Sequence, residues 1–271
     1  MNSEKNLLQL QDWFKTSTKG NIFIALSGGV DSAVVAFAAK TAIGEKAIAI
    51  TANYMTLAQF ELEDAKRVAK EIGIKHVIIE YDELEDTHFV KNDLRRCYYC
   101  RKSLAEHIKA HIEKYQITDI IDGTHLDDMN EYRPGLIALR EHKIKSPLLD
   151  TKIGKKEVRE IARKYNISVA DKPPNSCLAS RIPFGINITK ENLKKIELSE
   201  ERVKEIFKVR QVRVRDHGDI ARIEIANNEM EKMFNIQKLN QIDGELKRIG
   251  FKFVSLDLTG YKSGKLIVIN D

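Results

Sequence analysis

Short apolar runs alternate with amphipathic segments along the larger, amino-terminal part of the chain. Runs rich in β-branched and aromatic residues predict buried strands at residues 21–26, 46–51, 76–80 and 119–123. Apolar residues at helical spacing predict helices near the amino terminus and within residues 32–39, 60–72, 104–115 and 151–165. The polar segment 82–96 is predicted to be a loop. Strands that alternate with helices indicate an α/β fold with a doubly wound, mostly parallel sheet, whose ligands bind beyond the carboxyl ends of the strands.

The pattern changes after a proline-bearing segment at residues 171–185, which has no clear periodicity and is predicted to be a functional loop. Beyond it the chain predicts a long helix and a second helix that ends near Gly250. Strands are predicted at residues 211–215, 220–225, 251–258 and 265–269. We therefore expect a larger domain over residues 1–185 and a small α+β domain over residues 186–271, which serves substrate binding or oligomerisation.

Residues 27–32, Ser-Gly-Gly-Val-Asp-Ser, lie on the turn between the first predicted strand and its helix. The start of a helix leaves backbone N–H groups unpaired and carries partial positive charge. Gly28 and Gly29 let an anion approach the backbone, and Ser27 and Ser32 add hydroxyl donors. The turn is therefore predicted to bind phosphate. It is not a Walker loop, a dinucleotide fingerprint or a hydrolase elbow, because their glycine, lysine and serine spacings are absent.

This hexapeptide resembles the SGGxDS loop of the ATP pyrophosphatases, the PP-loop or adenine nucleotide α-hydrolase-like group. The resemblance implies cleavage of ATP to AMP and pyrophosphate, with adenylation of a carboxyl or carbonyl oxygen. It also implies that the end of the second strand meets the adenine. The candidate ATP-binding residues are Ser27, Gly28, Gly29, Asp31, Ser32, Thr51, Asn53, Gly123 and Asp127.

The composition indicates the class of protein, the charge of its ligand and its compartment. The chain has 271 residues, a net charge of +5 and 42% hydrophobic residues, which suits a globular protein with an anionic ligand and does not require nucleic acid. Its apolar runs are too short to span a membrane, and the first residues lack a signal-peptide layout, so we expect a cytoplasmic protein. Three cysteines in a reducing compartment favour metal binding or chemistry over disulfides.

Acidic and basic residues follow the fourth predicted strand. Asp127 and Asp128 suit a Mg²⁺ ion held against triphosphate, although either one also suits an Asx turn or a helix cap. Arg133 is a candidate for a phosphate clamp or for a surface ion pair.

The cysteines leave four interpretations open. Cys97 and Cys100 form a C-x-x-C pair, and Cys177 stands alone in the proline-bearing loop. The pair follows a predicted polar loop, whereas thioredoxin-like chemistry requires a pair that opens a helix. Structural zinc requires a fourth ligand, for which His88, His107 and His125 are candidates. Three thiolates on a [4Fe–4S] cluster leave one iron open, and plain free thiols are the fourth interpretation.

Two further motifs extend the resemblance. Residues 175–181, Asn-Ser-Cys-Leu-Ala-Ser-Arg, and residues 131–135, Glu-Tyr-Arg-Pro-Gly, are similar to segments of the LarE family. With the phosphate loop they occur in the family's order and cover most of the chain. LarE proteins are PP-loop sulfur transferases that build the sulfur atoms of the nickel-pincer nucleotide cofactor of lactate racemase. The resemblance implies adenylation of a carboxylate of pyridinium-3,5-dicarboxylate mononucleotide and replacement of its oxygen by sulfur.

The family has two versions, which differ in the source of sulfur. In one version the cysteine at the position of Cys177 gives up its own sulfur and becomes dehydroalanine. In the other version that cysteine and a C-x-x-C pair hold a [4Fe–4S] cluster, whose open iron carries sulfide. The presence of Cys97 and Cys100 makes this chain similar to the cluster version, with all three cysteines as ligands.

A pair of arginines in the small domain adds positive charge. Arg213 and Arg215 alternate with Val212 and Val214, which places them on one face of a strand about 7 Å apart. That spacing suits a phosphate or a pair of carboxylates, although a solvated polar face would show the same pattern. Matching to the family supports Arg213 and Arg215 and adds Glu201 as catalytic residues beside Cys177. The candidate substrate and phosphate contacts are Arg133, Ser180, Arg181, Arg213 and Arg215.

We therefore predict an ATP-dependent sulfur transferase that uses ATP, Mg²⁺ and a [4Fe–4S] cluster. The alternatives are a tRNA thiolase of the same ATPase group and sacrificial sulfur donation from Cys177. A tRNA enzyme would show a basic stripe with aromatic residues, and the arginines here cluster locally instead. A nucleotide-binding regulator would not need the cysteines, and an ammonia-using amidotransferase would not explain them. We expect a homo-oligomer without membrane or nucleic-acid partners, and the sulfide donor is left open.

Overall fold

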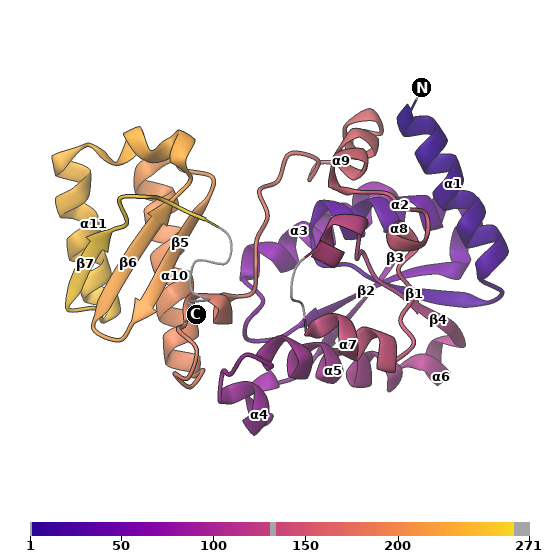
Figure 1. Cartoon of the computed structure of the whole chain (residues 1–271), viewed down its shortest axis with the longest axis horizontal. Coiled ribbons are helices and arrows are strands. Elements are labelled where there is room, and N and C mark those ends of the chain that lie inside the picture. The colour runs from indigo at the N-terminus through magenta and orange to yellow at the C-terminus, as the bar shows by residue number, and fades with distance from the viewer. Residues whose placement is uncertain (1, 131–133, 263–271) are drawn as a thin grey trace. The chain divides into compact units, whose positions relative to one another are not determined.

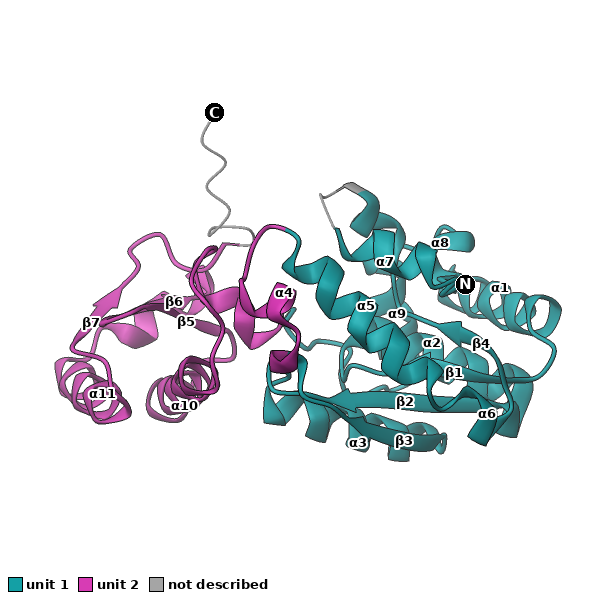
Figure 2. Ribbon diagram, turned by 90° about the horizontal axis from the view of Figure 1, so that it is seen from below, with its two compact units in different colours: residues 1–83, 95–175 teal, residues 84–94, 176–271 magenta. Residues whose placement is uncertain are grey.

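The computed structural model describes residues 2–130 and 134–262, and the chain divides into two compact units. Unit 1 comprises residues 1–83 and 95–175, and unit 2 comprises residues 84–94 and 176–271 (Figure 2). The chain thus leaves unit 1 at residue 84, returns at residue 95 and leaves it again at residue 176, before the expected boundary at residue 186. The early excursion was not expected, because a polar segment with no periodicity shows nothing of where it packs.

Unit 1 is built on a four-stranded parallel sheet with the order β3-β2-β1-β4 (Figure 1). The strands are β1 (Asn21–Ala25), β2 (Ala47–Asn53), β3 (Lys75–Glu80) and β4 (Ile117–Ile121). All four lie within two residues of the predicted runs at their starts and ends. The predicted parallel α/β sheet is therefore confirmed, and the carboxyl ends of its strands share one edge.

Helices cover both faces of this sheet, as the alternating side chains of β1 require. Ile22 and Ile24 point into a core with α1 (Asn2–Ser17), α2 (Val30–Ile43), α3 (Gln59–Ile72), α8 (Pro147–Asp150) and α9 (Lys155–Lys164). Phe23 points into the opposite core with α5 (Arg96–Lys109) and α6 (Ile112–Tyr115). α7 (Gly135–Glu141) packs against α5. Two apolar cores on opposite faces make the sheet doubly wound.

Unit 2 is the predicted α+β fold. Its helices are α4 (Thr87–Val90), α10 (Lys190–Phe207) and α11 (Ile236–Ile249), and its strands are β5 (Val212–His217), β6 (Ile220–Ile225) and β7 (Phe253–Leu256). The sheet order is β5-β6-β7, with β5 antiparallel and β7 parallel to β6. α10 and α11 cover one face through a separate apolar core. The strand predicted at residues 265–269 lies outside the described residues.

The segment predicted as a loop at residues 82–96 contains α4, and its residues 84–94 pack inside unit 2. Asn92 holds it there: this residue is buried, has a φ of 53° and donates side-chain hydrogen bonds to the carbonyls of Pro183 and Ile186, both at 2.9 Å. No helix among the described residues is both long and apolar enough to cross a membrane.

α5 begins at Arg96, earlier than the helix predicted from residue 104. Its first turns expose or half-bury most of their side chains, so the apolar spacing that predicts a helix is missing there. The prediction that the C-x-x-C pair follows a loop is therefore wrong, because the pair opens this helix.

Glu83, the last residue of unit 1 before the excursion, has a buried carboxyl group. Its Oε1 accepts a hydrogen bond from the Thr56 amide at 2.8 Å, and its Oε2 has no partner among the described residues. Burial raises the pKa of Glu83 to about 7. Because the folded-state pKa lies above the unfolded-state value, the folded protein binds the proton more tightly, and stability falls as the pH rises towards 7.

We expect Glu83→Gln to be more stable than the wild type at pH 8 by about 1–3 kcal/mol, because it removes a buried charge and keeps an acceptor for Thr56. The two proteins should converge near pH 5, where Glu83 is protonated in the folded state. Urea unfolding at both pH values measures the difference. Glu85→Gln is the matched control at an exposed position and should show no such pH dependence. A difference that does not change with pH would contradict the titration of Glu83.

Candidate active site

The phosphate loop joins β1 to the first turn of α2 and is braced from within. Gly28 has a φ of 72°, and a Cβ there would meet the Glu61 carbonyl oxygen at 2.5 Å, so the position requires glycine. The Ser32 hydroxyl donates to the Gly29 carbonyl at 3.1 Å and accepts from the Ser27 amide at 3.1 Å. Ser32 therefore shapes the loop, and the amides at the start of α2 have no carbonyl of their own helix to bond.

The predicted strand-end residue Gly123 lies against this turn. A Cβ on Gly123 would lie 2.9 Å from the amide nitrogen of Ser32, so only glycine allows the end of β4 to approach α2 this closely. The neighbouring Asp122 is buried and accepts from the hydroxyl of Ser146 at 2.6 Å and from the amide of Thr124 at 3.2 Å. These bonds hold the end of β4 beside the phosphate loop.

A group of charged residues surrounds the buried His125 beside the loop. Lys155 donates from Nζ to Asp31 Oδ2 at 2.5 Å and from its backbone amide to Asp127 Oδ2 at 2.7 Å. His125 Nδ1 lies 3.6 Å from Asp127 Oδ2, and the His125 amide donates to Asp128 Oδ2 at 3.0 Å. Asp128 is buried and closes this turn, whereas Asp127 is exposed.

The acidic residues fit a Mg²⁺ ion that is completed by phosphate oxygens. Asp31 Oδ1 is buried and has no hydrogen-bond partner among the described residues. Mg²⁺ in phosphate sites commonly takes one or two carboxylates, with phosphates and water as its other ligands. Asp31 and Asp127, which share Lys155 as a neighbour, are the residues that would supply these carboxylates.

Two predicted nucleotide residues at the end of β2 have their side chains engaged within the fold. The Thr51 hydroxyl is buried, donates to the Leu26 carbonyl at 2.6 Å and bonds His76 Nε2 at 2.8 Å. Asn53 donates to Glu80 Oε1 at 3.1 Å. Thr51 therefore offers a nucleotide only its backbone. Arg133 lies outside the described residues.

The C-x-x-C pair lies in the first turn of α5, in unit 1. Cys97 is exposed and Cys100 is half-buried, and the two lie one helical turn apart, outside any disulfide. The guanidinium of Arg95 lies 5.0 Å from the ring centre of Tyr98, which stands between them in the sequence. Cys177 is also outside any disulfide and belongs to unit 2. Within residues 2–130 and 134–262, no three His, Cys, Asp or Glu side chains are grouped to hold a metal ion.

In unit 2, a fully buried arginine holds the loop that carries Cys177. Arg181 donates to both carboxylate oxygens of Glu200, at 2.8 and 3.0 Å, and to the carbonyl of Cys177 at 2.9 Å. Burial opposes ionisation of Glu200, but the charges of Arg181 and Arg213 outweigh it and lower its pKa. Arg181 thus supports the loop with its guanidinium, and Ser180 bonds the Ser176 hydroxyl at 2.8 Å.

The arginines of β5 are buried on the face opposite the valines, so the solvated polar face that sequence left open is excluded. Arg215 donates to Glu224 Oε2 from two nitrogens, at 3.0 and 2.8 Å, and to the Ser180 carbonyl at 2.8 Å. Burial and the nearby charge of Arg181 lower the pKa of Arg213 to about 10. Three arginines against Glu200 and Glu224 leave net positive charge beside Cys177, which suits an anionic ligand.

The sequence of this chain is similar to those of several known proteins. The family profile described as queuosine biosynthesis protein QueC matches residues 21–96, which include the phosphate loop. The pyridinium-3,5-bisthiocarboxylic acid mononucleotide synthase of Lactiplantibacillus plantarum is 30% identical over 90% of this chain and 88% of its own. The chain belongs to the LarE family. An uncharacterised protein of Synechocystis is 36% identical over 97% of both chains.

This LarE-family chain is also similar over 88 residues to an NH₃-dependent NAD⁺ synthetase of Pyrococcus furiosus, with 38% identity over 32% of this chain and 34% of the synthetase. Together the comparisons confirm the predicted PP-loop fold and indicate an ATP-using enzyme.

Sequence reasoning missed Glu200 and chose the adjacent Glu201, which the structure places on the exposed side of α10. Helical spacing could have indicated that Glu200 is buried. Glu200 lies four residues after Ile196 and three before Val203, and both of these face the interior. Lys155 and Glu224 were also missed, because no local pattern separates them from surface charges.

We expect Glu200→Gln to destabilise unit 2 by about 3–5 kcal/mol, because it leaves the charge of Arg181 buried without a carboxylate. Glu201→Gln is the matched control on the same helix turn and should change stability by less than about 0.5 kcal/mol. Urea unfolding of both variants beside the wild type measures this. Equal stabilities for the two variants would contradict the support that Glu200 gives to the Cys177 loop.

Proposed function

We propose that this protein uses ATP to adenylate a carboxylate of pyridinium-3,5-dicarboxylate mononucleotide and then replaces the carboxylate oxygen by sulfur. The observation that carries the proposal is the similarity, over nearly the whole chain, to the Lactiplantibacillus plantarum synthase. The open phosphate loop in unit 1 and the positively charged surroundings of Cys177 in unit 2 support it.

The chemistry requires activation before sulfur transfer. A carboxylate is a poor electrophile, and it becomes an acyl adenylate when one of its oxygens attacks the α-phosphorus of ATP and pyrophosphate leaves. A sulfur nucleophile then attacks the acyl carbon, and AMP leaves with the original oxygen. Sulfide as the nucleophile gives the thiocarboxylate directly. The Cys177 thiolate would give a thioester, whose bond between sulfur and the cysteine Cβ must break to release the thiocarboxylate and leave dehydroalanine in the protein. A sulfur nucleophile of lowered basicity stays ionised for the attack.

Unit 1 supplies the groups for the first step. The amides at the start of α2 bind the phosphates that become pyrophosphate, and they stabilise the charge that develops on them. A Mg²⁺ ion held by Asp31 and Asp127 would neutralise phosphate charge. Lys155 bonds the carboxylate of Asp31 and adds a further positive charge beside the phosphates. Gly123 keeps this edge of the sheet close to the loop.

Unit 2 supplies the groups for the anionic substrate. Arg213 keeps its positive charge in a buried position and is the first candidate for the carboxylates or the phosphate of the mononucleotide. Arg215 and Arg181 bond the backbone of the Cys177 loop and so orient it. Ser180 contributes a hydroxyl in the same loop, and Glu201 adds an exposed carboxylate on α10.

The sulfur chemistry belongs to the cysteines. We propose that Cys97, Cys100 and Cys177 hold a [4Fe–4S] cluster, which would supply an open iron for sulfide when bound. Three cysteines outside disulfides, two of them in the first turn of a helix, suit this ligand set. Cysteines outside disulfides also agree with a cytoplasmic protein, which we propose as its location. We further propose that the protein assembles as a homo-oligomer, as its family does.

We expect Cys177→Ala to form pyrophosphate and AMP from ATP only when the dicarboxylate mononucleotide is present, and to yield no thiocarboxylate. The reason is that activation depends on unit 1 residues, whereas sulfur transfer depends on Cys177. Pyrophosphate assays and mass spectrometry of the product separate the two steps. Asp31→Asn is the complementary variant and should lose pyrophosphate formation. Stimulation of pyrophosphate release by tRNA, and not by the mononucleotide, would favour a tRNA thiolase instead.

We expect protein purified without oxygen to contain about four irons per chain with acid-labile sulfide, and Cys97→Ala to lose them. Tyr98→Phe, between the two cysteines, is the matched control and should keep them. Zinc in place of iron would give the pair a structural role. Absence of any metal, with loss of one H₂S from the mass of Cys177 after reaction, would establish sacrificial sulfur donation.

A further inference from the structure

A lysine at the start of the proline-bearing segment, after α9, reaches the phosphate loop. Lys172 is half-buried, and its Nζ donates to the Gly28 carbonyl at 3.0 Å. The same atom lies 2.5 Å from Glu61 Oε2 and 2.6 Å from Asp64 Oδ2, both on α3. One ammonium therefore joins the loop to two carboxylates of a neighbouring helix, all within unit 1.

Lys172 contacts the peptide group between Gly28 and Gly29. The carbonyl of this peptide group can point in either of two opposite directions. Neither glycine has a Cβ to restrict rotation of the peptide, so its carbonyl and its N–H can exchange places at little cost. The peptide is trans, and its carbonyl and the Gly29 N–H therefore point in opposite directions. A charge that holds the carbonyl on the α3 side turns the Gly29 N–H away from α3.

The partners of Lys172 keep it in place. Glu61 is buried, and its second oxygen accepts from the Asn175 side chain at 2.8 Å. Lys172 and Asn175 thus both bond the carboxylate of Glu61. Pro173 and Pro174 lie between them and restrict the backbone of this short segment. The ammonium has little freedom to leave the Gly28 carbonyl.

We propose that Lys172 is a positioning residue of the phosphate loop, which holds the Gly28 carbonyl so that the Gly29 amide faces the phosphates of ATP. Lys172 acts through the peptide and does not touch the nucleotide. The inference rests on the proposed ATP site and adds to it a residue that selects the binding orientation of the loop. Without Lys172, the peptide can turn its carbonyl oxygen towards the phosphates, and two negative groups then face each other.

The test compares Lys172→Met with the wild type in calorimetric titrations with ATP, inorganic pyrophosphate and AMP, all with Mg²⁺. We expect the affinities for ATP and pyrophosphate to fall about tenfold or more, since a hydrogen bond to a charged group is lost. The affinity for AMP should stay within about twofold, because AMP lacks the phosphates that leave as pyrophosphate. Lys66→Met removes an exposed ion pair with Glu63 on α3 and is the matched control, which should leave all three affinities unchanged.

A second measurement can overturn the proposal with the wild type alone. With ¹⁵N-labelled glycine, the Gly29 amide resonance of the wild type should shift when pyrophosphate is added, and in Lys172→Met it should shift less. An unmoved Gly29 resonance in the wild type would overturn the proposal even if the variant failed to fold. An equal loss of affinity for ATP, pyrophosphate and AMP, in step with a lower melting temperature, would also overturn it and leave Lys172 a purely structural ion pair. A wild type that binds neither ATP nor pyrophosphate would overturn the proposed function itself, and this inference with it.

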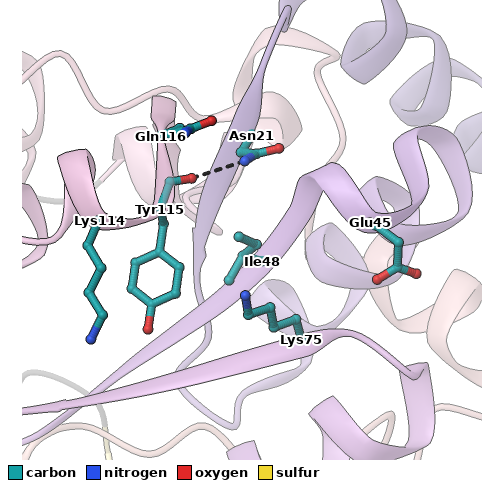
Figure 3. A pocket seen from close by; sticks show the side chains of 7 residues that line it. All are labelled: Asn21, Glu45, Ile48, Lys75, Lys114, Tyr115 and Gln116. Atoms are coloured by element: carbon teal, nitrogen blue, oxygen red, sulfur yellow. Dashed lines mark hydrogen bonds between the residues drawn. The ribbon is translucent and has the colours of Figure 1, made fainter.

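Unit 1 also has a pocket that lies apart from the phosphate loop. A pocket of about 310 Å³ lies at the opposite, amino-terminal edge of the sheet (Figure 3). Asn21, Ile48 and Lys75 line it from the first residues of their strands, and Tyr115 contributes its ring. The pocket lies away from the phosphate loop, and its exposed lysines alone do not define a ligand.

Discussion

The first turn of α2 has backbone amides that its own helix cannot satisfy, and much of unit 1 is arranged around that constraint. Gly28 and Gly123 allow α3 and the end of β4 to approach the turn to distances that a Cβ would prevent. Ser32 braces the loop from within. These contacts fix the shape of the turn, whose amides have no carbonyl of their own helix to bond and so suit an anion.

The stability of unit 2 depends on a different constraint, which is that its buried charges need partners of opposite charge. Arg181, Arg213 and Arg215 are buried, and each would be costly there without carboxylates or carbonyl groups around it. Glu200 and Glu224 compensate two of the three charges and at the same time fix the Cys177 loop through Arg181 and Arg215. The positive charge of the arginines suits an anionic ligand. The same group of side chains thus stabilises the unit and sets the charge around Cys177.

Periodicity predicted β5, β6 and the four strands of unit 1 to within two residues, because each buries apolar side chains. β7 buries none of its side chains and is shorter than the predicted run at residues 251–258. Periodicity failed at two places for related reasons. The first turns of α5 are largely exposed, so they lack an apolar face that would reveal a helix. Residues 84–94 are polar and owe their position to hydrogen bonds of the buried Asn92 with residues distant in sequence. Neither the helical state of these turns nor the packing of residues 84–94 can be predicted from neighbouring residues alone.

The sequence by itself determined the parallel sheet, the phosphate loop and the alternation of Arg213 and Arg215 with valines, since each follows from nearest-neighbour order along one element. Only the tertiary structure decided which charged groups meet. It paired Arg181 with Glu200 and not with the exposed Glu201, brought Lys155 to Asp31 and brought Lys172 to the Gly28 carbonyl. The physical reason is that a charged side chain acquires its function from the burial and the partners that folding gives it, and these come from residues far apart in the chain.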